Sequence, residues 1–476
     1  MPDEAGHGLL SQKTPRALMP FYGESLVLLC SLLFCVLLSR FLFASILSVA
    51  IFIVWLLLLS YRHPPFILKY LYVFFSVVAA VAGCCYIEFF SPLWLPELQI
   101  HTAFVGSLPL LIFGNWLLVT AIFWMDIIWG CENDSLRTPR SPNRENAVNA
   151  FAWIALVITI LAFVNVMYDP SFARGVDRFA YDALHSGNLI VTISSKLLPY
   201  LILASILAVR AGKRALGLVS VFFYCLFLFW TGEKFGGYFL LACEFALVFY
   251  DRIYAFAKES ARKLMAVLAC VVVLLVGLAC FAYSFTSSDS IDDFLEYRVA
   301  AQGQLWWATY EKLDGSSHPE EIWDEVTALR KDGNNIPANV GSNNGIYKMM
   351  YFTAPQSVVD SKLARGSRYS GGGFATAYYY GGVLGVTLFS CVSGLLISLI
   401  TNALVRAFRD KRIIDAFLLL RLFLLSQITL GMFLFSVFLE PITILSLIWL
   451  LGGWLSRKSR RRYKVNLPYH VSGDHT

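Results

Sequence analysis

Residues 42–61 read LFASILSVAIFIVWLLLLSY, a stretch of about twenty residues without a charged side chain. A helix of that length, at about 1.5 Å per residue, crosses the hydrocarbon core of a bilayer. The rest of the chain is similar in character, since 58% of its 476 residues are hydrophobic, 15% are charged and the mean hydropathy is +0.64. This composition excludes a soluble enzyme and predicts an all-α polytopic membrane protein.

Apolar runs between charged residues predict about twelve transmembrane helices. The runs lie at residues 24–40, 42–61, 66–89, 102–129, 147–168, 189–209, 215–232, 235–250, 264–286, 374–404, 413–438 and 441–455. Only Arg40 and Phe41 separate the first two runs, so one bent helix in their place is the alternative.

The positions of the basic residues orient these spans. With the N-terminus in the cytoplasm, most of the 38 Lys and Arg fall on the cytoplasmic side, as the positive-inside rule requires. Both termini are then cytoplasmic. The basic tail at 456–476 is explained by attraction to anionic lipid headgroups, so nucleic-acid binding is not expected. The spacing of the ten cysteines fits neither a metal site nor a disulfide framework.

One polar stretch is large enough to fold outside the bilayer, at residues 287–373. It divides the chain into a cytoplasmic tail at 1–23, membrane helices at 24–286, this external loop domain, membrane helices at 374–455 and the basic tail at 456–476. Apolar residues at helical spacing predict an amphipathic helix over 291–313. A second helix is expected to begin at Pro319 and to stop at Gly333.

Two charges lie inside predicted spans, where an ionisable side chain must be paired or hydrated. Lys196 follows two serines and precedes Pro199, residues that can open a helix to water or to a ligand. A lysine that extends to the membrane interface is the alternative. Arg421 lies deeper, and we expect it to form a structural ion pair with Glu244.

The stretch TGEKFGGY, residues 231–238, joins two predicted spans on the external side with almost no loop. Its glycines allow close approach of the backbone to a substrate, and the start of the following helix offers N–H groups to an anion. With Lys234 beside that helix start, the corner is a candidate phosphate-binding site. A tight turn carrying a solvated Glu233–Lys234 pair is the alternative.

Arginines also gather near the external surface. They are Arg174, Arg178, Arg298, Arg365 and Arg368. Guanidinium groups bind phosphate oxygens in a bidentate manner, so these side chains are candidate pyrophosphate ligands. After the loop, GGGFATAYYYGGVLG (371–385) opens the next span. Tyr380 and its neighbours either belong to the interfacial aromatic belt or stack against a sugar or isoprenoid.

The order of four features along the chain is informative. They are a Gly-x-Lys corner opening a mid-chain span (Gly232-Glu233-Lys234), one further span, a large external loop with an arginine near its start (Arg298), and a Tyr-rich entry with spaced glycines (Tyr380, Gly382, Gly385). In this order, over roughly residues 150–400, the chain resembles the O-antigen polymerases of the Wzy type. The related ligases carry a histidine near the end of the loop, and His318 lies too early for that place.

The resemblance implies a GT-C-like membrane glycosyltransferase that joins repeat units carried on undecaprenyl pyrophosphate, at the periplasmic face of a bacterial inner membrane. It implies Glu233, Lys234 and Arg298 as catalytic residues, and Arg174, Arg178, Lys196, Arg365, Arg368 and Tyr380 as ligands of the pyrophosphate or glycan. The general base is open among Glu233, Glu296 and His185. No metal or other cofactor is implied. The implied partners are the lipid-linked oligosaccharide, membrane lipids and, where chain length is regulated, a polysaccharide co-polymerase.

Two other classes fit part of the sequence. A transporter or flippase of lipid-linked oligosaccharide would use many spans and intramembrane charges, but it would not need the external domain. A membrane acyltransferase would normally carry a histidine within the membrane, and His101 at the edge of a span is the nearest example. The polymerase is the function that accounts for both the loop and its arginines.

Overall fold

The structure is a computed structural model. It describes residues 19–465 apart from 130–141, 176–180, 182–183, 186, 234, 258, 261–262, 264–276, 278–290, 324, 326–343 and 365–366. The predicted span at 264–286 therefore lies, except for residue 277, outside the described part of the chain.

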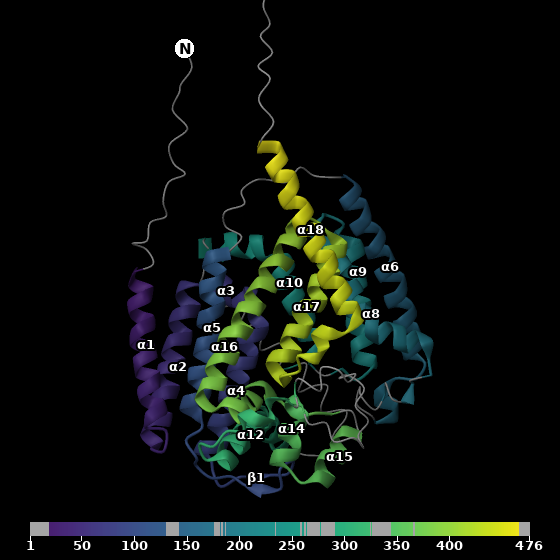
Figure 1. Cartoon of the computed structure of the whole chain (residues 1–476). Helices are drawn as coiled ribbons and strands as arrows, with labels where there is room; N and C mark the ends of the chain where they lie inside the picture. The colour runs from purple at the N-terminus through teal and green to yellow at the C-terminus, as the bar shows by residue number, and fades with distance from the viewer. Residues whose placement is uncertain are drawn as a thin grey trace, which may run out of the picture.

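The described chain is dominated by long apolar helices that lie side by side (Figure 1). These are α1 (Met19–Leu37), α2 (Leu42–Arg62), α3 (Pro64–Lys69), α4 (Leu71–Phe89), α5 (Leu108–Trp129), α6 (Pro142–Met167), α8 (Leu189–Arg210), α9 (Arg214–Trp230), α10 (Gly236–Val248), α16 (Gly372–Arg409), α17 (Ile413–Met432) and α18 (Pro441–Val465). Within the described residues, 6 helices are long and apolar enough to cross a membrane, namely α2, α4, α5, α6, α16 and α17. Parts of α1, α9, α10 and α18 are apolar but shorter. The protein is thus a helical, multi-pass membrane protein.

The two ends of the bundle differ. α1 begins and α18 ends at one end, which we call the tail face, while α12 (Ile291–Leu313), α14 (Gly345–Thr353), α15 (Gln356–Ala364) and a small hairpin lie at the other, the loop face (Figure 1). The hairpin pairs β1 (Trp94–Leu95) with β2 (Ile100–His101) in antiparallel register. Short 3-10 turns, η3 (Ser171–Arg174), η4 (Pro319–Glu321) and η5 (Ser436–Leu439), complete the described elements.

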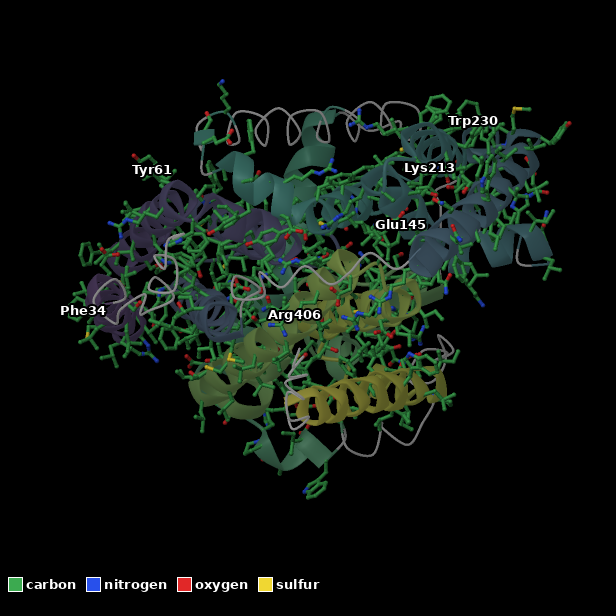
Figure 2. All side chains as sticks on the ribbon, turned by 90° about the horizontal axis from the view of Figure 1, so that it is seen from above. Phe34, Tyr61, Glu145, Lys213, Trp230 and Arg406 are labelled. Atoms are coloured by element: carbon green, nitrogen blue, oxygen red, sulfur yellow. The ribbon has the colours of Figure 1, made fainter. Side chains whose placement is uncertain are left out.

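Ion pairs join helix ends at the tail face. The Asp251 carboxylate forms ion pairs with Arg210 at 2.7 Å and with Arg409 at 3.0 Å, which links α8 to α16. Lys411 pairs with Glu145 of α6. Figure 2 looks onto this face, where Glu145, Lys213 and Arg406 lie over the bundle and Phe34 points outward at its edge. Charged groups at helix ends and apolar groups on the outer surface are what a bilayer requires of a spanning bundle.

The helix predicted over 291–313 is confirmed as α12, and it lies directly on the end of α4. Gly303 and Gly83 allow this contact, because a Cβ at Gly303 would lie 2.2 Å from the backbone nitrogen of Cys84. The indoles of Trp306 and Trp307 donate to the carbonyls of Ser107 and Ala103, each at 3.1 Å. Both rings are fully buried. α12 is therefore packed into the loop face of the bundle and does not rest loosely on it.

Glu97, in the hairpin turn, fastens the surrounding elements together. Its carboxylate accepts from Tyr297 and Gln304 of α12 and pairs with Lys362 of α15. Its carbonyl accepts from the Tyr369 hydroxyl at 2.7 Å. We refer to α12, η4, α14 and α15 together as the loop unit.

α16 changes direction near its N-terminal end. Gly382 has φ 53° and ψ −138°, which separates a short first segment, residues 372–381, from the long segment that ends at Arg409. A side chain is disfavoured at this φ, so glycine suits the position. Gly373 in the first segment packs on α17, since its Cβ would lie 1.9 Å from the carbonyl oxygen of Leu430.

Candidate functional site

A lysine lies between two tyrosines and a glutamate where η4, α14 and α16 meet at the loop face. The Lys348 ammonium forms an ion pair with Glu321 and lies 5.2 Å and 5.4 Å from the ring centres of Tyr379 and Tyr380. Only 11% of the Lys348 side chain is exposed, against 38% for Glu321. Ring faces and a carboxylate both stabilise the ammonium. We call Glu321, Glu325, Lys348, Tyr379 and Tyr380 the Lys348 cluster.

Each carboxylate of the cluster accepts from a tyrosine. The Tyr379 hydroxyl donates to Glu321 Oε2 at 2.8 Å, and the Tyr380 hydroxyl donates to Glu325 Oε1 at 2.8 Å. The backbone N–H of Gly345, at the start of α14, also donates to Glu325. These bonds fix both carboxylates in position, and both residues are partly exposed to solvent.

The break at Gly382 helps to assemble the cluster. In an α-helix, each backbone carbonyl normally accepts from the N–H four residues later. The break at Gly382 releases the Tyr379 carbonyl from that role. This oxygen accepts instead from the backbone N–H of His318 at 2.8 Å. The His318 ring then stacks on the Tyr379 ring with centroids 4.8 Å apart. The kink thus anchors η4 to α16.

The electrostatics favour an ionised Glu321. Its pKa lies below its usual value of 4.5, because Lys348 and Tyr379 donate hydrogen bonds to the carboxylate, and this outweighs the opposing effect of burial. The carboxylate is therefore charged at neutral pH.

This lowered pKa predicts how pH affects the docking of η4. A carboxyl group whose pKa is depressed by folding contributes stability above its unfolded pKa and loses it as the pH falls through the folded value. We expect protease resistance around η4 to be constant between neutral pH and about pH 5 and to decrease below about pH 4. Limited proteolysis at graded pH measures this. In Glu321→Gln the decrease should be smaller, and an unchanged acid profile would contradict the assignment.

His318, Glu320 and Glu321 form the one group of histidine and carboxylate ligands close enough to share a cation among the residues described, with ligand atoms within 4.8 Å of one another. His318 Nδ1 lies 3.4 Å from Glu320 Oε1. Glu321 already accepts from Lys348 and Tyr379, so a cation here would compete with an ammonium. The geometry therefore supports the ion pair between Glu321 and Lys348 in preference to a cation bound at this group.

Two of the predicted arginines lie at the loop face, Arg298 on α12 and Arg368 between α15 and α16. Arg368 is exposed, and its guanidinium stacks over the Tyr347 ring at 5.2 Å, next to Lys348 in the chain. Arg298 is exposed on α12. Their chain neighbours Tyr369 and Tyr297 both bind Glu97. The structure therefore packs Arg368 against Tyr347 of α14 and ties the segments that carry Arg368 and Arg298 to the same hairpin.

The Gly-x-Lys corner has a defined structural role. Gly232, with φ 77°, follows the end of α9, its N–H donates to the Phe229 carbonyl, and the Glu233 N–H donates to the Leu228 carbonyl. This pair of bonds is a Schellman C-cap. Glu233 is buried, and its carboxylate accepts from the Phe235 N–H at 3.4 Å at the start of α10. The helix start predicted to receive a substrate anion thus faces a carboxylate of its own chain, and Lys234 lies outside the described residues.

Within its described part, the structure does not bring together the other residues that were predicted to bind the pyrophosphate or glycan. Lys196 is exposed on α8, which continues without interruption through Pro199. Arg178 and Arg365 lie outside the described part, and of Arg174 only the backbone, in η3, is described. Tyr380 is 4% exposed, so its ring packs inside the protein and its hydroxyl serves Glu325.

The predicted partner of Arg421 is wrong. Arg421 pairs with Glu440 at the end of η5, and its Nε donates to the Thr443 hydroxyl at 3.3 Å. Glu244 is 1% exposed on α10, and its carboxylate oxygens have no hydrogen-bond partner within the described structure. Partner choice depends on helix order across the bundle, and Glu440 is brought close by the turn between α17 and α18.

The three predicted candidates for the general base lie in different surroundings. Both ring nitrogens of His185 face acceptors, Nδ1 the Tyr181 carbonyl at 2.9 Å and Nε2 Asp169 at 3.0 Å. The Glu233 carboxylate is turned to its own backbone, and the side chain of Glu296 lies outside the described part. Glu321, which was not predicted from the sequence, is a carboxylate that is fixed by two donors, ionised and partly exposed at the loop face.

Comparison with known proteins adds one likeness. The sequence model of a family of unknown function, DUF6418, matches residues 339–448. The matched part contains α14, α15, α16 and α17, and so Lys348, Arg368, Tyr379 and Tyr380, whereas Glu321 and Glu325 precede it. Neither the curated proteins nor the solved structures yielded a match.

Proposed function

We propose that this protein is a GT-C-like glycosyltransferase with about twelve spans, which polymerises undecaprenyl-pyrophosphate-linked oligosaccharide at the periplasmic face of the inner membrane. The observation that carries the proposal is the Lys348 cluster. It holds an ionised carboxylate and a lysine at one face of the bundle, the face at which Arg368 packs over Tyr347. In the proposed orientation the loop face is periplasmic.

In the proposed reaction, a hydroxyl of the incoming repeat unit attacks the anomeric carbon of the growing chain. The new carbon–oxygen bond forms as the bond to pyrophosphate breaks, and undecaprenyl pyrophosphate leaves. Glu321 accepts the hydroxyl proton. Arg368 and Arg298 stabilise the charge that develops on the pyrophosphate, where fixed donors are most effective. Lys234, Arg174, Arg178 and Arg365 stay candidates for the same role.

A cellular assay tests these roles. A polymerase-deficient Gram-negative host with the matching repeat unit is complemented with the parent chain, Arg368→Ala or Arg298→Ala at equal expression. Each substitution removes a positive charge that would stabilise the leaving pyrophosphate. The amount of polymer should therefore fall by about 100-fold, leaving single capped units. Arg40→Ala is the matched control, since Arg40 is an exposed arginine at this face that pairs with Asp314 and is not a proposed ligand of the pyrophosphate. Full ladders from both variants would exclude the arginines as pyrophosphate ligands.

The transporter or flippase stays a second candidate for a specific reason. The broken helix α16, the Arg421–Glu440 pair and the buried Glu244 are features typical of transport pathways. The absence of any ladder from a well-expressed parent chain would favour this function over polymerisation.

A further inference from the structure

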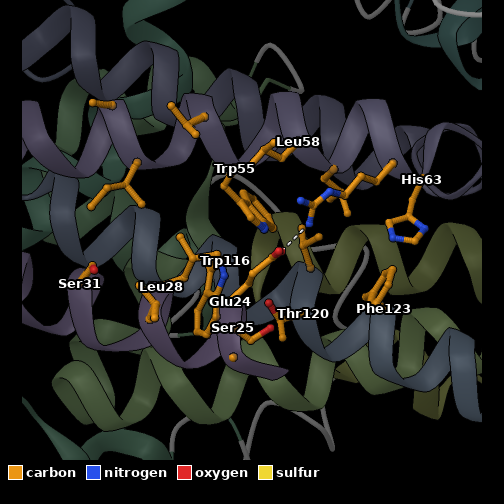
Figure 3. Close-up of a pocket in the computed structure, with 18 residues that line it drawn as sticks. Glu24, Ser25, Leu28, Ser31, Trp55, Leu58, His63, Trp116, Thr120 and Phe123 are labelled. Carbon is orange, nitrogen blue, oxygen red and sulfur yellow. Dashed lines mark hydrogen bonds and ion pairs between the residues drawn. The ribbon is translucent and has the colours of Figure 1, made fainter. Parts of the chain in front are cut away.

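A groove with a volume of about 690 Å³ lies between α1, α2 and α5, away from the loop unit. It is formed by the first half of α1 and the second halves of α2 and α5, and so belongs to the tail-face half of the bundle (Figures 1 and 3). Its size is that of a site for a small organic molecule. Trp55 and Trp116 form its inner wall, and both are buried.

The groove is apolar along its length and polar at one end. Leu28 and Leu58 line the apolar part. The polar residues are Glu24, near the start of α1, and Arg62 and His63, at the end of α2 on the tail-face side. Arg62 Nη1 lies 2.6 Å from Glu24, and nearly half of each side chain is exposed. An amphiphile with an apolar chain and a charged head matches this polarity.

The surroundings of the groove identify the source of that amphiphile. Val27 and Val54 line it and are more than half exposed, and Leu57 on the outer surface of α2 is 64% exposed. α2 and α5 are long and apolar enough to span a membrane. The groove therefore opens toward the hydrocarbon of the bilayer. An apolar group there is already surrounded by lipid chains and not by water.

We infer that this groove binds one acyl chain of a bilayer phospholipid, with the headgroup phosphate at the Arg62 and His63 end. The guanidinium, which is accessible beside Glu24, binds the phosphate, and the tryptophans pack along the chain. The groove lies in the half of the bundle opposite the Lys348 cluster, so this lipid is distinct from the proposed donor. The inference does not depend on the proposed function.

Photo-crosslinking of the full-length protein tests the inference. The protein is placed in nanodiscs of phosphatidylethanolamine and phosphatidylglycerol that contain a phosphatidylethanolamine with a diazirine on one acyl chain. Labelled peptides are identified by mass spectrometry after irradiation. We expect labelling of α1 near Leu28 and of α5 near Trp116. Ala50→Trp or Thr120→Trp, which fill the groove from different helices, should each reduce it about tenfold.

Leu57→Trp is the matched control, because it adds the same ring to α2 outside the groove and should leave labelling unchanged. Gel filtration of all variants shows whether they are folded. Equal labelling in the parent and both filled variants would overturn the inference, as would labelling spread evenly over outward-facing residues. Labelling of the groove by a photoreactive polyprenyl phosphate but not by the phospholipid would also overturn it.

Discussion

Replacing Glu321 by glutamine is expected to lower the rate of repeat-unit transfer by about 100-fold to 10,000-fold, the contribution typical of a positioned general base. Glutamine keeps the size of the side chain and can still accept from the Tyr379 hydroxyl, but it cannot take the proton of the attacking hydroxyl. The rate is measured with purified protein in proteoliposomes, as the growth of glycan on a lipid-linked repeat unit.

Two variants separate this role from a structural one. Glu320→Gln is the matched control, because Glu320 precedes Glu321, is 67% exposed and should leave the rate unchanged. Lys348→Met removes the hydrogen bond that contributes most to the lowered pKa of Glu321. The pKa of Glu321 should then rise, and the acid limb of the pH–rate profile should move to higher pH. Unchanged transfer in Glu321→Gln would exclude this carboxylate as the base.

Replacing Gly303 by valine is expected to destabilise the protein by about 3 kcal/mol or more, because the new side chain overlaps backbone and not a flexible group. A Cβ at this position would lie 2.2 Å from the Cys84 nitrogen and 2.5 Å from the Gly83 carbonyl carbon. α12 must move away from α4, which also strains the hydrogen bonds of Trp306 and Trp307. Thermal unfolding in detergent and proteolysis of the loop unit measure the effect.

Gly381→Ala provides the control for that substitution. Gly381 lies in a helical stretch, and a Cβ there meets no atom within 4 Å. Its effect should stay within about 0.5 kcal/mol, as for an ordinary surface substitution. If Gly303→Val were as stable as the parent chain, the close packing of α12 on α4 would be wrong.

Hydrophobic periodicity was sufficient for much of the fold. The bounds of α12 follow from apolar residues on one helical face, and most long apolar runs became helices because a bilayer leaves the backbone few other choices. The same pattern could not show how tightly α12 docks. Trp306 and Trp307 are neighbours in the chain and point in different directions from the helix, yet both are fully buried, because α12 is enclosed from more than one side.

Local motifs were ambiguous where one sequence serves two purposes. A glycine beside a helix start is typical of both a phosphate-binding corner and a helix C-cap, and Gly232 forms the C-cap. The partner of Arg421 could not be chosen from sequence, since it depends on which helices are neighbours.

The Lys348 cluster was not predictable for a related reason. Its members come from η4 and the residues just after it, from α14 and from the start of α16, three segments that are separate in the chain. Tyr379 and Tyr380 stood out in the sequence, but their carboxylate and lysine partners follow no period or motif. The break at Gly382 contributes to the assembly, because it lies beside Tyr379, whose carbonyl accepts from the His318 N–H and so joins η4 to α16.

The most direct test of the account is reconstitution of the purified chain in proteoliposomes with a matching undecaprenyl-pyrophosphate-linked repeat unit as the sole sugar donor. We expect glycans of more than one repeat unit on the lipid, with release of undecaprenyl pyrophosphate, in the absence of any nucleotide sugar. Movement of the intact lipid-linked unit across the bilayer, without elongation, would contradict glycosyl transfer and identify the chain as a transporter.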